Sequence, residues 1–176
     1  MMKILLFTVF VWTIQISYQA SAQTKTNNDM YSIISLVIGH INPKIPIVDT
    51  LVPTVISSKF LREQLEAKVL LNSAQKRRLK KLDGSEKGIL IDSGQLSGFK
   101  IKSYKTVFQA FRQLSSGHTE YIDKEKPFFL VRKPIIFDAR IAIVDIDLFG
   151  GFGAIYILTK KNSKWEIVNE VGKWYN

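Results

Sequence analysis

The spacing of apolar residues in this chain changes at Pro127, and this change limits the possible folds more than any other feature. Upstream, apolar residues recur every three or four positions, as on the buried face of a helix. Downstream, four runs are typical of strands, at residues 128–137, 140–149, 153–160 and 164–171. Their junctions are too short for the crossover that a parallel pair needs. We therefore expect an α+β fold, with N-terminal helices packed on a C-terminal four-stranded antiparallel meander.

The first part of the upstream region predicts a helix and then an extended segment. Asp29 is expected to cap a helix that ends at Asn42-Pro43, because a residue before proline avoids the helical conformation. Residues 45–52 are rich in β-branched side chains and short. Since Pro46 cannot donate a backbone hydrogen bond, we expect this segment to be an edge strand or merely extended.

Two more helical regions are expected before Pro127. One begins at about Ser57 or Ser58, has an apolar stripe that reaches Asn72, and is followed by a helical piece over residues 74–82. The other is capped by Ser103 and ends at Gly117. Residues 83–103 between them contain four glycines, which predicts a long connection with one short strand at residues 88–91.

The first 22 residues have the three parts of a secretory signal peptide. Lys3 is followed by an 11-residue run that is mainly apolar, then by a more polar stretch and the small-x-small pattern of Ala20-Ser21-Ala22. A membrane-spanning helix needs about 20 apolar residues, so an uncleaved anchor is the weaker alternative. We expect cleavage before Gln23 and export to the periplasm or outside the cell, with no membrane span afterwards. The mature chain would have a flexible N-terminus, residues 23–28, and a single domain, residues 29–176.

The chain has no cysteine and a net charge of +10, which becomes +9 once Lys3 is removed with the leader. The lack of cysteine excludes disulfides, a thiol nucleophile, a thiolate metal site and a lipid-modified N-terminal cysteine. The excess of cations favours acidic partners such as polyanionic glycans, anionic membrane surfaces or nucleic acid, although many soluble surfaces are equally basic.

Five cations in six residues form a basic run within the second helical piece: Lys76, Arg77, Arg78, Lys80 and Lys81. Such a run can follow a polyanion, and its binding would weaken with salt. No aromatic residues are interleaved with the cations to stack on bases, which makes nucleic acid an unlikely partner. A plain solvated helix face is the interpretation that we favour.

Asp145 and Asp147 are two residues apart in the strand-like run 140–149, so their side chains point to the same face about 6.6 Å apart. Two such carboxylates could bind a hard cation or share acid–base work. No further ligand spacing accompanies them, and alternation with apolar residues is also typical of a half-buried structural strand. We favour the structural interpretation.

Other candidate residues are weaker. His40 lies at the end of the first predicted helix and His118 follows the last one, and a cation is favourable at either place without any catalytic role. The glycines around Phe152 suit a hairpin with positive φ angles, although they could also admit a ligand to the backbone. No known catalytic constellation is present, so we expect no catalytic residue, no metal ligand and no cofactor.

The C-terminal tail shows a resemblance to known proteins. Its parts are 151–158, Lys160-Lys161, 164–168, 170–172 and Trp174. Over about 25 residues it resembles the ending of small, exported, functionally uncharacterised bacterial α+β proteins, which implies fold and export but no activity. The chain is more loosely similar to nuclear-transport-factor-two-like domains, whose conical sheet holds a pocket. That likeness implies Asp145, Asp147 and Tyr156 as pocket residues.

These observations lead to one functional expectation with two alternatives. We expect a non-catalytic binding or interaction protein, whose partner could be an envelope protein or an acidic polymer. The alternatives are a small-ligand binder or enzyme with a conical pocket, and a polyanion-binding surface built on residues 76–81.

Overall fold

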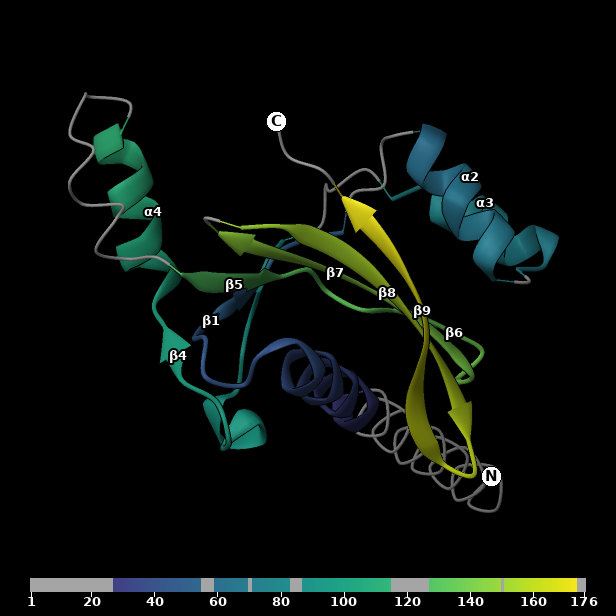
Figure 1. Cartoon of the computed structure of the whole chain (residues 1–176), viewed down its shortest axis with the longest axis horizontal. Coiled ribbons are helices and arrows are strands. Elements are labelled where there is room, and N and C mark those ends of the chain that lie inside the picture. The colour runs from purple at the N-terminus through teal and green to yellow at the C-terminus, as the bar shows by residue number, and fades with distance from the viewer. Residues whose placement is uncertain are drawn as a thin grey trace, which may run out of the picture.

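The computed structural model describes residues 27–54, 59–69, 71–82, 87–114, 127–149 and 151–173. The fold is α+β, with one large twisted sheet and helices on both of its faces (Figure 1). The helices are residues 27–41, α2 (Lys59–Lys68), α3 (Ser73–Lys80), the 3₁₀ turn η1 (Ser93–Leu96) and α4 (Tyr104–Leu114). The strands are β1 (Ile47–Val48), β2 (Thr50–Leu51), β3 (Ile89–Leu90), β4 (Ile101–Lys102), β5 (Phe128–Val131), β6 (Ile135–Phe137), β7 (Ile141–Phe149), β8 (Gly153–Lys161) and β9 (Lys164–Lys173).

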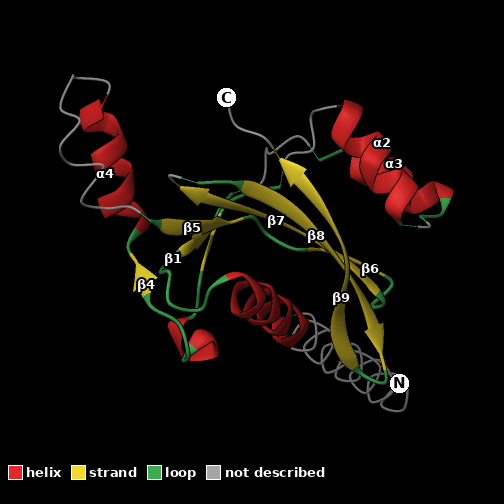
Figure 2. Ribbon diagram, in the orientation of Figure 1, coloured by secondary structure: helices red, strands yellow, loops and turns green. Residues whose placement is uncertain are grey.

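The large sheet has seven strands rather than the four that the sequence predicts. Its order is β4-β1-β5-β7-β8-β9, and β6 also pairs with β7 (Figure 2). The expected antiparallel meander is present as β7, β8 and β9. The first expected strand is broken into β5 and β6, which pair with successive parts of β7. Pro134 lies in this break, where it does not interrupt a ladder of hydrogen bonds.

The remaining difference comes from β1 and β4, which extend the sheet beyond the meander. Strand β1 is parallel to both β4 and β5 and lies between them, so the expected edge strand is internal. Pro46 is compatible with this place because it precedes the first paired residue. Its carbonyl accepts a hydrogen bond from the Phe129 amide, with an N–O distance of 2.8 Å. These pairings join segments far apart in the chain, which local patterns do not reveal.

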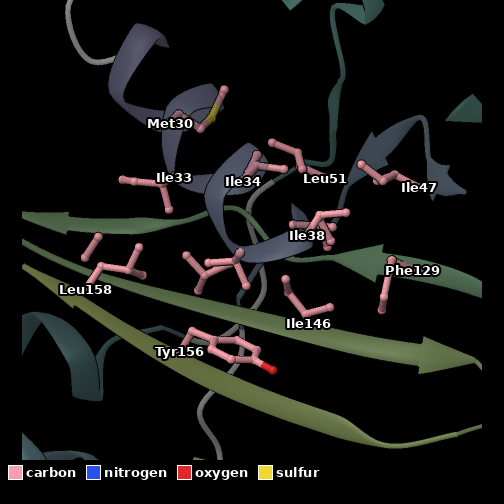
Figure 3. Packing of buried hydrophobic residues seen from close by; sticks show 14 of the residues in the cluster. Met30, Ile33, Ile34, Ile38, Ile47, Leu51, Phe129, Ile146, Tyr156 and Leu158 are labelled. Atoms are coloured by element: carbon pink, nitrogen blue, oxygen red, sulfur yellow. The ribbon is translucent and has the colours of Figure 1, made fainter. Parts of the chain in front are cut away.

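The helix of residues 27–41 packs on one face of the sheet and forms the main core with it (Figure 3). Four of its side chains have no exposed surface: Ile33, Ile34, Val37 and Ile38. The expected cap, Asp29, lies inside the helix, because Asn27 and Asn28 are already helical. Its carboxylate instead binds the Lys160 ammonium and accepts a hydrogen bond from the Trp165 indole, at 3.1 Å.

Helices α2 and α3 cover part of the opposite face and form a second core cluster with β7 and β8. Leu65 of α2 and Leu79 of α3 are fully buried there. Helix α3 begins with a capping box, in which Asn72 accepts from the Gln75 amide while the Gln75 side chain accepts from the Asn72 amide. The sequence predicts that Asn72 ends the apolar stripe of the preceding helix. In the structure it is instead the cap of α3.

The connection before α4 contains the expected short strand, β3, and also η1 and β4. Strand β3 pairs only with β2, in a separate two-stranded sheet. Ser103 directly precedes α4, as predicted, and its carbonyl accepts from the Val107 amide at 3.1 Å. The Tyr104 amide donates to the Asp49 carboxylate at 2.7 Å, so the distant β1–β2 segment also caps this helix. The expected helix end at Gly117 lies outside the described residues.

The two hairpin turns that follow β6 and β8 have positive φ angles, at Asp138 and Ala139 and at Asn162 and Ser163. Positive φ was also expected in the glycine turn after β7, but Gly151 does not adopt it. Gly151 is suited to its place for a different reason. A β-carbon there would lie only 2.8 Å from Leu148 Cδ2.

We expect Ala139→Gly to raise the free energy of unfolding by about 0.5–1 kcal/mol, because it relieves an L-residue held at a φ of 53°. Equilibrium urea unfolding measures this change. The matched control is Ala142→Gly in buried, extended backbone, which should lower stability by about 1 kcal/mol. Equal effects of the two substitutions would contradict the strain at Ala139.

Candidate functional site

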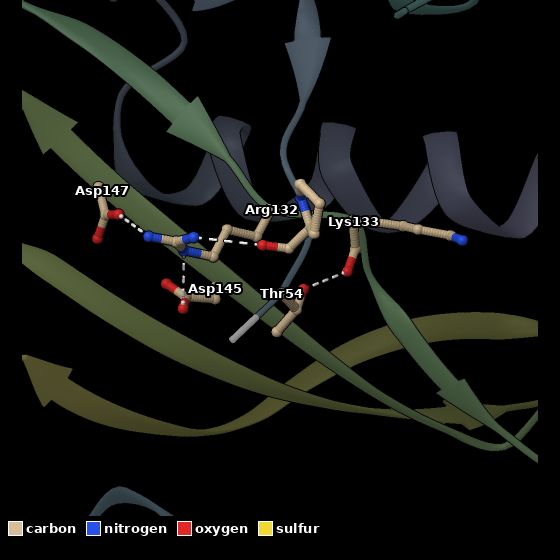
Figure 4. Close-up of polar contacts among 6 residues, drawn as sticks. Thr54, Arg132, Lys133, Asp145 and Asp147 are labelled. Carbon is tan, nitrogen blue, oxygen red and sulfur yellow. Dashed lines mark hydrogen bonds and ion pairs between the residues drawn. The ribbon is translucent and has the colours of Figure 1, made fainter. Parts of the chain in front are cut away.

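The two candidate aspartates of β7 are joined by a residue that the sequence did not single out, Arg132 (Figure 4). The Arg132 Nη2 atom lies 3.3 Å from Asp147 Oδ2 and donates a hydrogen bond to it. The Arg132 Nε atom lies 3.2 Å from Asp145 Oδ2, within ion-pair range but without hydrogen-bond alignment. Asp145 is 3% exposed and Asp147 17%. We call these three residues the Arg132 cluster.

The Arg132 cluster also ties the chain segment after β2 to the sheet. Arg132 Nη1 donates to the Pro53 carbonyl at 3.2 Å, and the Arg132 amide donates to the Asp145 carbonyl at 2.9 Å. Next to it, the buried Thr54 hydroxyl donates to the Lys133 carbonyl at 2.7 Å. The arginine thus joins β7, the β5–β6 break and the segment at residues 52–54.

This arrangement favours a structural role for the two aspartates. A guanidinium between two carboxylates compensates the charge that burial makes costly. A hard cation would need further oxygen ligands in its place. Among the described residues, no group of three or more His, Asp or Glu side chains is placed to hold a metal ion.

We expect Asp145→Asn to lower the free energy of unfolding by about 1–3 kcal/mol, because it leaves a partly buried guanidinium with a weaker partner. Asp147→Asn is the matched control. This carboxylate is more exposed, so its loss should cost less than about 1 kcal/mol. Chemical denaturation of both variants measures the two losses of unfolding free energy. A larger loss in Asp147→Asn than in Asp145→Asn would contradict the prediction.

Tyr156, the third residue of the implied conical pocket, lies on the opposite face of the sheet. It pairs with Val144, whereas Asp145 pairs with Ile155, so the side chains of Tyr156 and Asp145 point away from each other. Tyr156 belongs to the core beneath the N-terminal helix, and its ring lies edge-on to His40 with 6.2 Å between centroids. The structure therefore does not bring the three expected pocket residues together.

Burial, and then the Glu170 carboxylate on β9, raise the pKa of Tyr156 to about 12. The phenol is neutral in both folded and unfolded chains below about pH 9. In the unfolded chain it ionises near pH 10, so unfolding releases a proton between pH 10 and 12 and stability falls as the pH rises.

Tyr156→Phe removes this proton release, so its stability should decline less steeply in alkali. Between about pH 9 and about pH 11.5, the free energy of unfolding of the original chain should fall by about 2 kcal/mol more than that of the variant. Urea unfolding at the two pH values measures the difference. Parallel declines would show that Tyr156 ionises normally in the folded protein.

The basic run divides into cations that hold α3 in place and cations that face outward. Lys76 pairs with Glu66 at 3.3 Å. Arg78 donates to the Ile136 carbonyl at 3.0 Å, and its guanidinium lies 5.4 Å from the centre of the Phe137 ring. Arg77, Lys80 and Lys81 are exposed, and we call these three residues the basic face.

The other candidates do not join a site. His40 is exposed near the end of the first helix, as expected. Phe152 is 45% exposed in the β7–β8 turn, where its carbonyl accepts from the Leu148 amide at 2.8 Å. His118 lies outside the described residues. Arg132 was missed because its partners are 13 and 15 positions away, on a strand whose register the sequence does not specify.

Comparison with known proteins yields no relative for this chain: no family model, no curated protein and no solved structure matches it. The resemblance of the tail to small exported bacterial proteins stays a prediction. Within the described residues, no helix combines the length and the apolar character needed to cross a membrane.

Proposed function

We propose that this chain is an exported, non-catalytic binding protein and that the basic face of α3 binds an acidic polymer of the cell envelope. The observation that carries this proposal is the distribution of charge. Residues 59–81 contain eight lysines and arginines and two glutamates, a net charge of +6. The whole chain carries +10, so 23 of its 176 residues hold more than half of its net charge.

The way in which α3 is held supports a fixed binding surface. Its capping box, the buried Leu79 side chain and the Arg78 hydrogen bond fix the inner side of the helix. The Gln75 side chain also donates from Nε2 to the Asp138 carboxylate in the β6–β7 turn, at 2.5 Å. Because these contacts leave the basic face turned to solvent, three cations are presented together on a rigid support.

A polyanion suits this surface better than a small anion. The basic face lies on the outer side of a helix, and its cations can each contact a different charged group along a polymer. Aromatic side chains that would stack on bases are absent from residues 72–82. An acidic envelope glycan therefore fits the proposal better than single-stranded nucleic acid.

The test compares two triple variants that lose the same charge. In the first, Arg77, Lys80 and Lys81 are replaced by Gln; in the control, Gln replaces the exposed residues Lys44, Lys105 and Lys164. Binding to heparin is measured as a function of salt. We expect the first variant to reduce the slope of log K against log salt by about 2–3, since each contact contributes about 0.7–0.9.

The control variant should keep most of that slope, although it has the same net charge. Equal losses in the two variants would mean that heparin responds only to overall charge, and the proposed surface would be wrong. The protein should be recovered from the envelope or medium of expressing cells, and an N-terminus at Gln23 would support export. Recovery of the intact chain from the cytosol would contradict that part of the proposal.

A further inference from the structure

A small polar cavity, open to solvent, lies where the N-terminal helix contacts the turn η1, beside the main core. It has a volume of about 260 Å³. In the described part of the chain, the residues that line it are Asn27, Asn28, Tyr31, Asp92 and Gln95. None of them belongs to the Arg132 cluster or the basic face, and the sequence patterns did not indicate any of them.

The walls of this cavity are held apart by the core. Tyr31 follows Met30 on the helix, and Asp92 and Gln95 are adjacent to Ile91 and Leu96. The three apolar neighbours are buried and belong to the same core cluster. The backbone of both walls is thus attached to packed residues of the main core, which hold the two walls in place.

Two hydrogen bonds orient the polar groups of the cavity. The Tyr31 hydroxyl accepts from the Asp92 amide at 2.9 Å, which leaves the hydroxyl proton to be donated elsewhere. Asp92 Oδ1 accepts from the Gly94 amide at 3.0 Å, which fixes the carboxylate at the start of η1. A donor and an acceptor are therefore held close together before any ligand arrives.

We propose that this cavity binds a neutral sugar ring. Three carboxamides, a phenol and a carboxylate provide both donors and acceptors, which suits hydroxyl groups because each hydroxyl can donate and accept. Among the described residues, the lining contains no lysine or arginine, so these side chains offer an anion no cationic partner. The volume lies just below the roughly 300–1,000 Å³ of cavities for drug-sized ligands, which fits one ring.

The experiment is an NMR titration of the isotopically labelled protein with glucose, galactose and N-acetylglucosamine, and with glucuronic acid as the anionic sugar. The side-chain amides of Asn27, Asn28 and Gln95 should shift and saturate. Affinity on the order of 1 mM is expected for a ligand of this size, so the titration extends to roughly 50 mM. The ring could come from a free sugar or from the end of a sugar chain, and binding of either would support the site. Comparing the affinities for the free sugar and for a short sugar chain would distinguish these two sources.

Variants locate the binding. Tyr31→Phe and Gln95→Ala should each weaken the affinity about three- to tenfold, because each removes a hydrogen-bonding group. Gln109→Ala removes an exposed carboxamide from α4 and serves as the matched control, with no expected change. Gln95 is exposed, so its substitution tests the cavity even if Tyr31→Phe fails to fold.

Three results would overturn the proposal: no saturable shift of the cavity amides with any of the sugars, unchanged affinity in Gln95→Ala, or binding of sugar acids alone with shifts on α3. The last result would support the basic face while excluding the cavity. Conversely, sugar binding by the triple variant of the basic face would support the cavity independently of the proposed polyanion.

Discussion

The structure depends on the burial of strand β7 on both faces. Its nine residues pair with β5, β6 and β8, so it is the centre of the sheet. Ala142, Val144 and Ile146 enter the core beneath the N-terminal helix. The alternate residues enter the opposite face, and there Asp145 is a charged group in a strand that is otherwise apolar at its centre. The fold therefore requires a cation at that position.

Arg132 meets this requirement, and its place explains the shape of the second face. Along β7, the two aspartates lie between Ile143, which packs with α2 and α3, and Phe149, which packs with the cluster next to α4. The Arg132 cluster thus separates two apolar clusters. Because the arginine belongs to the break between β5 and β6, its ion pairs tie this break to β7.

Local sequence patterns predict individual strands and the side chains that share one face of a strand. Alternation predicts the last three strand runs, which are present as β7, β8 and β9, and the common face of Asp145 and Asp147. The first predicted run is instead divided into β5 and β6. Contacts between residues far apart in the chain cannot be predicted from these patterns. Asp29 binds Lys160 and Trp165 more than 130 positions away, and β1 joins β4 and β5 through parallel pairing. The face of Tyr156 depends on the β7–β8 register, so a pocket shared with the aspartates could not be tested from spacing alone.

The same distinction explains why a count of charges overstates the binding surface. The run at residues 76–81 contains five cations, but Lys76 and Arg78 have partners within the fold. Arg78 also covers the Phe137 ring, so its aliphatic and planar parts stabilise the docking of α3. Its substitution would disturb the support as well as the charge. The binding surface that we propose is therefore formed by the exposed cations of the basic face and not by those that hold α3 against the sheet.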